Sequence, residues 1–152
     1  MTSSKSSPFK TEVATDADGF TLRVYGAERK LVGRMEVGID DGLARVLFVH
    51  VDKTIRRAGI GTRMYERAAR EACERGARLA SDDRRSKYAE AFWQKQVAKK
   101  RATCIDEGGA FQFRPTGGET TKYKAWKCAT FALTCPAPDS LGARRVKNAR
   151  RG

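Results

Sequence analysis

The alternation of apolar and polar residues predicts strands in the first third of the chain. Residues 20–25 place every second residue, all of them apolar, on one face, and residues 31–37 repeat the pattern. Residues 43–51 are apolar or β-branched at nearly every position, which is typical of a strand buried on both faces. Glycines and an Asp-Asp-Gly turn separate these runs. The opening therefore predicts an antiparallel meander that ends in a central strand.

The spacing of apolar residues becomes helical after residue 60, where they recur every four positions. These residues are Ile60, Met64, Ala68 and Ala72. Residues 61–76 thus predict an amphipathic helix that Gly76 ends, and Ser86 is a candidate N-cap for a second helix that ends near residue 101. Further strands are expected at residues 77–80, 102–105, 110–113 and 123–134.

The order of these elements predicts an α/β fold, more closely an α+β mixed sheet. At least two helices flank the sheet, and one of them is a crossover after the central strand. The length of 152 residues fits a single domain, which we place at residues 18–135. Residues 1–17 are expected to be a flexible segment and a first strand, and residues 136–152 a basic, disordered tail.

The charge balance narrows the classes of partner. Lys and Arg number 31 and Asp and Glu number 18, so the formal net charge is +13. The predicted tail holds five of the basic residues and one of the acids, and the rest of the chain keeps a charge of +9. This excess favours phosphates, nucleic acid or an acidic protein as partners. A membrane partner is not expected, because no apolar stretch approaches the roughly 20 residues that a bilayer needs.

The four cysteines lack the spacing of a metal site. None of Cys73, Cys104, Cys128 and Cys135 belongs to a Cys-x-x-Cys pair, and the chain has one histidine, so we expect no metal. The N-terminal segment lacks the apolar core of an export signal. We therefore expect a cytoplasmic protein with reduced thiols.

Residues 51–62 are the most informative segment, because a strand, a short basic loop and a helix follow one another directly. Gly59 and Gly61 let backbone N–H groups turn inward, and the start of a helix adds about half a positive charge. Such a junction can bind phosphate, and Arg56 and Arg57 add charge. The alternative is a tight turn without a ligand. The spacing fits neither the dinucleotide fingerprint nor the Walker A loop.

This segment resembles the acetyl-CoA loop of the GNAT superfamily of N-acetyltransferases. Arg56-x-x-Gly59-x-Gly61 matches the Gln/Arg-x-x-Gly-x-Gly/Ala signature, and Val51 matches the valine that ends the preceding strand. A later helix of the family often reads Asn-x-x-Ala-x-x-x-Tyr. In this chain those three positions are held by Ser86, Ala89 and Trp93. The resemblance implies a GNAT-like fold, with a central, mostly antiparallel, twisted sheet of about six to seven strands.

The resemblance also implies an enzyme that moves an acetyl group from acetyl-CoA, its co-substrate, to a primary amine. The amine belongs to a protein lysine, a protein N-terminus or a small molecule, and it attacks directly through a tetrahedral intermediate. Relatives hold the pyrophosphate on backbone amides of the loop, and the pantetheine arm lies beside the central strand. The residues implied to bind acetyl-CoA are Val49, His50, Val51, Arg56, Arg57, Ala58, Gly59, Ile60, Gly61, Thr62, Ser86 and Trp93.

The chain departs from the family at both positions that handle protons. Counting back from the loop places Arg45, which cannot act as a base, near the usual base position. Trp93 stands where the acid is usually a tyrosine. Tyr88, one helical turn earlier, is the candidate acid, with a core-packing aromatic as the alternative. His50 is the candidate base, although it should point away from the face of its two neighbouring valines.

The first pair of helices of the family is missing from the predicted order of elements. Residues 20–51 have room only for strands and turns, which predicts an acceptor groove that is open or is completed by the second subunit of a homodimer. The basic residues on the second helix are either a solvated face, a docking patch for an acidic protein or nucleic acid, or a contact for the 3′-phosphate of CoA, and the basic tail could deliver the protein to a nucleoprotein. The alternative function is therefore a basic nucleic-acid- or protein-binding module on a GNAT fold, which binds acetyl-CoA with little or no catalysis.

Overall fold

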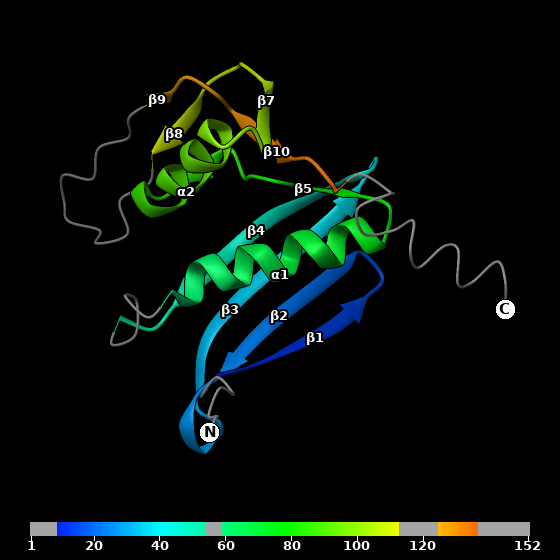
Figure 1. Ribbon diagram of the computed structural model, residues 1–152, viewed down its shortest axis with the longest axis vertical. Coiled ribbons are helices and arrows are strands. Elements are labelled where there is room, and N and C mark those ends of the chain that lie inside the picture. Colours follow the sequence, from blue (N-terminus) through cyan, green and yellow to red (C-terminus); the bar gives the residue numbers. More distant parts are fainter. Residues whose placement is uncertain (1–8, 54–58, 113–124, 137–152) are drawn as a thin grey trace, which may run out of the picture.

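The first half of the chain forms an antiparallel meander of four strands. A computed structural model describes residues 9–53, 59–112 and 125–136 (Figure 1). The strands are β1 (Lys10–Asp16), β2 (Gly19–Tyr25), β3 (Leu31–Asp40) and β4 (Leu43–Val51). The short 3-10 turn η1 (Ala27–Arg29) joins β2 to β3. Between residues 20 and 51 the structure has only strands, turns and η1, as predicted, and only residues 17 and 18 separate β1 from β2.

The helix α1 (Ile60–Glu74) crosses one face of this meander (Figure 1). Its buried residues, which have the predicted four-residue spacing, pack against the inward residues of β2 and β3. Gly33 of β3 allows the close approach, because a Cβ there would lie 2.9 Å from the Met64 sulfur. The chain then enters β5 (Arg78–Ala80), which pairs parallel to β4 and completes the predicted crossover.

The second half of the chain adds one helix and five short strands. They are β6 (Arg84–Arg85), α2 (Lys87–Ala98), β7 (Ala102–Asp106), β8 (Ala110–Gln112), β9 (Ala125–Trp126) and β10 (Thr130–Leu133). The main sheet of the described residues has the order β1-β2-β3-β4-β5-β10-β7, in which only the β4–β5 pair is parallel. The prediction of a mostly antiparallel sheet of six to seven strands is confirmed. A small second sheet of β6, β8 and β9 was not predicted.

The prediction that residues 43–51 are buried on both faces is wrong. The half of β4 that follows Val46 is largely exposed, with Leu47 at 54% and Phe48 at 42%. The reason is that α1 covers one face of the sheet, whereas no helix of the described residues covers the other face of β4 at this point.

The prediction of reduced thiols is also wrong. Cys73 at the end of α1 is bonded to Cys135, just after β10, and Cys104 on β7 is bonded to Cys128. The fold brings each pair to Cα separations of 5.7 and 6.0 Å, because β10 lies between β5 and β7 in the sheet. The assignment to the cytoplasm was based on the lack of an export signal in the N-terminal segment, and it stays a prediction.

Parts of the predicted organisation fall on residues that the structure does not describe. The flexible segment was placed partly on residues 1–8, and almost all of the basic tail falls on residues 137–152. Both lie outside the described residues, so the domain boundaries stay predictions. Neither helix in the described ranges has the length and apolar character needed to span a bilayer.

Candidate functional site

Strands β4 and β5 separate soon after they pair. Their parallel register covers three residues on each strand and ends at Arg45 and Ala80, yet β4 continues to Val51. No described strand pairs with residues 46–50 on that side of β4. Leu47 is an extra residue in the ladder with β3, since Val46 pairs with Val37 and Phe48 pairs with Glu36. This bulge redirects β4 at the point where the sheet opens.

The N-terminus of α1 is an open end of a helix. Gly59 caps it with a left-handed φ of +78°, and no side chain of the described residues accepts from its first turn. A Cβ placed on Gly59 or Gly61 would meet nothing within 4 Å, so a ligand can approach the backbone there. The N–H groups of Ile60, Gly61 and Thr62 have no acceptor within the helix, and the helix dipole makes this end attractive to an anion. The predicted Arg56, Arg57 and Ala58 lie outside the described residues.

A cavity of about 340 Å³ lies beside the point where β4 and β5 separate. Its walls come from β4, the segment after β5, the turn after β7 and the start of β10. They consist of Arg45, Asp82, Asp83, Asp106, Gly108, Gly109, Ala129 and Thr130. Arg45 joins three of these walls, because its Nη1 donates to the Ser81 carbonyl oxygen at 3.0 Å and to the Thr130 hydroxyl at 3.2 Å.

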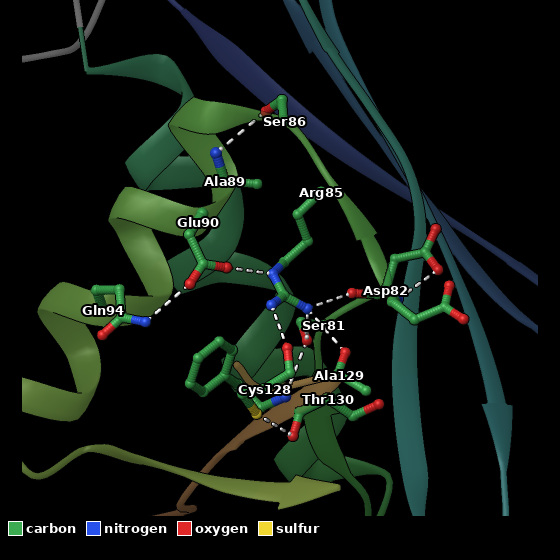
Figure 2. Close-up of polar contacts among 12 residues, drawn as sticks. Ser81, Asp82, Arg85, Ser86, Ala89, Glu90, Gln94, Cys128, Ala129 and Thr130 are labelled. Carbon is green, nitrogen blue, oxygen red and sulfur yellow. Dashed lines mark hydrogen bonds and ion pairs between the residues drawn. The ribbon is translucent and has the colours of Figure 1, made fainter. Parts of the chain in front are cut away.

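The buried guanidinium of Arg85 fixes the segment that carries Asp82 (Figure 2). Its Nε donates to Glu90 of α2 at 2.6 Å, and the side chains of this ion pair are 1% and 7% exposed. Its Nη1 donates to the Asp82 carbonyl at 2.7 Å and to the Ser81 hydroxyl at 3.2 Å. Two further bonds reach the carbonyls of Cys128 and Ala129. One arginine thus ties the end of β5 to α2 and to the start of β10.

The pKa of the Asp82 carboxyl group, on the wall of this cavity, is shifted from its usual value. Burial raises the pKa of Asp82 above its usual value, and the neighbouring carboxyl group of Asp83 adds to the rise. Hydrogen bonds from the backbone N–H groups of Asp83 and Arg84 lower it in part. Figure 2 shows the Asp82 carbonyl facing Arg85, with the side chain on the other side of the segment. Its Oδ1 accepts from the Asp83 N–H at 2.7 Å, and Asp82 is one of the residues that line the cavity.

The residues predicted for proton transfer do not meet in this cavity. His50 lies on the exposed face of β4, five residues beyond Arg45, and its neighbouring valines pack against the core, as expected. At about 3.3 Å per residue this separation along the strand is roughly 16 Å. Tyr88 is 72% exposed near the start of α2 and does not line the cavity. It is therefore not the core-packing aromatic of the alternative interpretation.

Two residues assigned to acetyl-CoA have structural roles in α2. Ser86 caps the helix by accepting from the Ala89 N–H at 3.1 Å, as the sequence predicts. Trp93 is 1% exposed and packs in an aromatic cluster with Tyr65, Phe92 and Phe131. Burial raises the pKa of the Tyr65 phenol in this cluster well above its usual value. The binding role of these two residues remains a prediction.

Sequence reasoning missed the three acids of the cavity. Asp82 and Asp83 come after the short strand predicted at residues 77–80, where the sequence alone predicts a turn, and Asp106 ends a strand from another part of the chain. A signal was present, because two adjacent carboxylates lie one residue after the strand that follows the first predicted helix. Its meaning depends on β7 and β10 closing the cavity, and that arrangement is visible only in the fold.

The chain is similar to known acetyltransferases in sequence pattern and in fold. Residues 3–97 match the sequence profile of the Acetyltransferase (GNAT) family. The crystal structure of the ribosomal-protein-S18-alanine N-acetyltransferase from Escherichia coli superposes with a TM-score of 0.55 at 11% identity, over 81% of this chain and 74% of that one. Nourseothricin acetyltransferase superposes with a TM-score of 0.50 at 18% identity, over 85% of each chain. No curated protein matches the chain significantly in sequence. At these identities the two structures establish the fold alone.

Proposed function

The chain belongs to the GNAT acetyltransferase family, and from that premise we propose that it transfers the acetyl group of acetyl-CoA to a primary amine by direct attack. The family is one of acyl-CoA-dependent N-acetyltransferases, so the enzyme class follows from membership. The acceptor is the proposed part: a protein lysine, a protein N-terminus or a small amine. The observation that supports it is the opening between β4 and β5, beside a cavity lined with carboxyl groups.

The described residues fit acetyl-CoA at two places. The start of α1, which has no side-chain cap and has open space beside Gly59 and Gly61, suits the pyrophosphate. The edge of β4 from residue 46 onward pairs with no strand of the described ranges on the β5 side and suits the pantetheine arm, with residues 49–51 as the predicted contacts. The bound thioester supplies an activated acyl carbon. A backbone N–H of this edge would stabilise negative charge on its carbonyl oxygen.

The acceptor must lose a proton before it can react. A lysine amine has a pKa near 10.4, so at pH about 7.4 roughly one amine in a thousand is neutral. Supplying the neutral form costs about 4 kcal/mol, which a group that accepts the proton in the site can offset. An N-acetyltransferase therefore benefits from a carboxylate or imidazole beside the acceptor.

Thermal unfolding with acetyl-CoA, CoA and inorganic pyrophosphate, each at two salt concentrations, tests the cofactor part of this proposal. A ligand at about 100 times its Kd adds about 2.7 kcal/mol, or a rise in Tm of about 5–10 °C for a chain of this size. We expect a rise with acetyl-CoA and CoA that persists in salt, and a weak, salt-sensitive rise with pyrophosphate. An equal, salt-sensitive rise with all three would contradict the proposal.

A matched pair of variants locates the binding site. Gly61→Glu puts a carboxylate at the open end of α1, where it should abolish the rise in Tm with CoA while the helix dipole tolerates the charge. Thr11→Glu makes the same change of net charge on exposed β1 and should keep the rise. Release of the CoA thiol with a panel of amines then measures acetyl transfer. A CoA shift without transfer to any amine favours the alternative of a binding module.

A further inference from the structure

Asp82 combines three properties that no other acid of the described residues shares. It lines the cavity beside the separation of β4 and β5, its backbone carbonyl accepts from the buried Arg85, and its side chain lies on the side of the segment away from Arg85. Asp83 is exposed, and Asp106 faces the same cavity from β7. The family signature and the sequence pattern assign no role to any of the three.

We propose that the Asp82 carboxylate accepts the proton of the acceptor ammonium group, and that the cavity is the binding site of a cationic amine. This inference rests on the proposed acetyl transfer. The residue at the usual base position supports it, because Arg45 is permanently charged and is held by Ser81 and Thr130. The other candidate base, His50, lies on the exposed face of β4 at a distance from this cavity.

The step balances with the groups named here. The acceptor R–NH3⁺ gives one proton to the Asp82 carboxylate and becomes R–NH2. Its nitrogen lone pair forms the new C–N bond to the acetyl carbon, and the C–S bond breaks with its electron pair going to sulfur. The second proton of the attacking nitrogen goes to the CoA thiolate, and Asp82 returns its proton to water.

The charges around the cavity favour a cation as the acceptor. Asp82, Asp83 and Asp106 place three carboxyl groups on its walls, and Arg45 opposes them with one positive charge. The whole chain carries +13, so this concentration of acids stands against the general charge of the protein. A cationic amine drawn into the cavity would neutralise carboxylates that otherwise repel one another. A neutral or anionic acceptor would gain nothing from them.

The groups that face Asp82 set the direction of its pH dependence. They are Asp83 on the same segment, Arg45 on β4 and Asp106 on β7, with the Arg85 guanidinium behind the backbone. Because the pKa of Asp82 is raised, the acid limb of kcat/KM should lie above the usual range of an aspartate. Removing the charge of Asp83 should lower the pKa of Asp82 and move that limb to lower pH.

The test compares Asp82→Asn with Asp83→Asn in the full chain, using a lysine peptide and a peptide with a free α-amino group as acceptors. Asn keeps the Oδ1 that accepts from the Asp83 N–H, so the local structure is retained. We expect Asp82→Asn to lower kcat/KM for the lysine peptide by about 10²–10⁴-fold at pH 7. The deficit should shrink for the α-amine, whose pKa near 8 leaves more of it neutral, and should shrink for lysine as the pH rises.

Stability separates this role from a structural one. A raised pKa in the folded state contributes stability below the pKa of the unfolded chain, and that stability is lost as the pH rises through the folded value. At pH 7 the ionised Asp82 therefore costs stability, and Asp82→Asn should keep or raise the Tm while it loses activity. Asp41→Asn, at a turn with a left-handed φ of +54° that Asn tolerates, controls for the change of charge.

The outcomes divide cleanly. A fall in Tm in parallel with activity, or an equal deficit for both peptides at every pH, would overturn the role of Asp82. Full activity of Asp82→Asn would overturn it as well. A wild-type protein that transfers acetyl to neither peptide nor to a diamine would instead contradict the proposed function, and the Tm shift with CoA shows separately whether the cofactor site is intact.

Discussion

Replacing Glu90 by glutamine should destabilise the fold strongly, because it leaves the buried guanidinium of Arg85 without a counter-charge. Breaking a buried ion pair by removing one partner costs about 3–5 kcal/mol. Here the side chains are 1% and 7% exposed, and the pair is joined at 2.6 Å. Four other hydrogen bonds of Arg85 go to neutral oxygens and survive the substitution, as does an amide oxygen at position 90. We therefore expect the lower end of the range, about 3 kcal/mol.

Thermal and urea unfolding under oxidising conditions measure this loss. For a chain of this length 1 kcal/mol corresponds to about 2–4 °C, so the Tm of Glu90→Gln should fall by about 6–12 °C. Glu12→Gln is the matched control, since it breaks an exposed pair with Arg29 in which the side chains are 48% and 67% exposed. Such a pair contributes under about 1 kcal/mol.

A second variant separates charge from packing. The double substitution Arg85→Met with Glu90→Leu removes both charges, but it also takes the Arg85 donor away from four oxygens, so it should be less stable than Glu90→Gln alone. Equal, small losses for Glu90→Gln and Glu12→Gln would refute the reasoning, since they would mean that water reaches Arg85 in the folded protein.

Three further predictions concern the backbone and the disulfides. Gly19→Ala should cost about 3 kcal/mol or more by urea unfolding, because its Cβ would collide with the Val37 carbonyl oxygen; a loss below 1 kcal/mol would show that β2 and β3 can move apart. Cys73→Ser opens a disulfide between residues 62 apart and should lower the free energy of unfolding by about 4 kcal/mol. Cys104→Ser opens one between residues 24 apart and should lower it by about 3.5 kcal/mol. A larger loss for Cys104→Ser than for Cys73→Ser in calorimetry would contradict the explanation by loop entropy. Gly59→Ala should lower the free energy of unfolding by about 1 kcal/mol, because alanine is disfavoured at a left-handed φ, while its Cβ meets no other atom. An unchanged Tm would mean that the backbone at this cap is not left-handed.

Much of the fold could be predicted because its core follows simple periodicities. The bounds of β4 match the predicted run, α1 follows the four-residue spacing, and α2 begins after the predicted Ser86 cap. The bulge at Leu47 could not be read, since apolar residues on both sides of it hide the change of alternation. The two-residue strand β6 is too short to give a pattern.

The sequence predicted only the part of the site that a single short segment of the chain forms. The glycine-rich start of α1 is such a feature, because one short segment forms it. The cavity is not, since its walls come from β4, the segment after β5, the end of β7 with the turn that follows it, and the start of β10. The disulfides were not predicted for the same reason, because the two cysteines of each pair lie 62 and 24 residues apart and their spacing carries no signal. Asp82 looked like a turn residue because its environment is made by strands that follow it in the chain.

The late position of β10 in the sequence sets an order on folding. The hairpins of β1 to β4 close short connections, whereas β10 must enter between β5, about 50 residues earlier, and β7. Loop closure of that length is slow relative to local pairing, so we expect the meander and α1 to form first and β10 to insert last. Until then Arg85 lacks the carbonyls of Cys128 and Ala129, and its charge stays in contact with water. Pulsed hydrogen exchange should therefore protect the amides of β2 and β3 before those of β10, and a chain that stops before residue 128 should keep a hydrated, loosely packed α2.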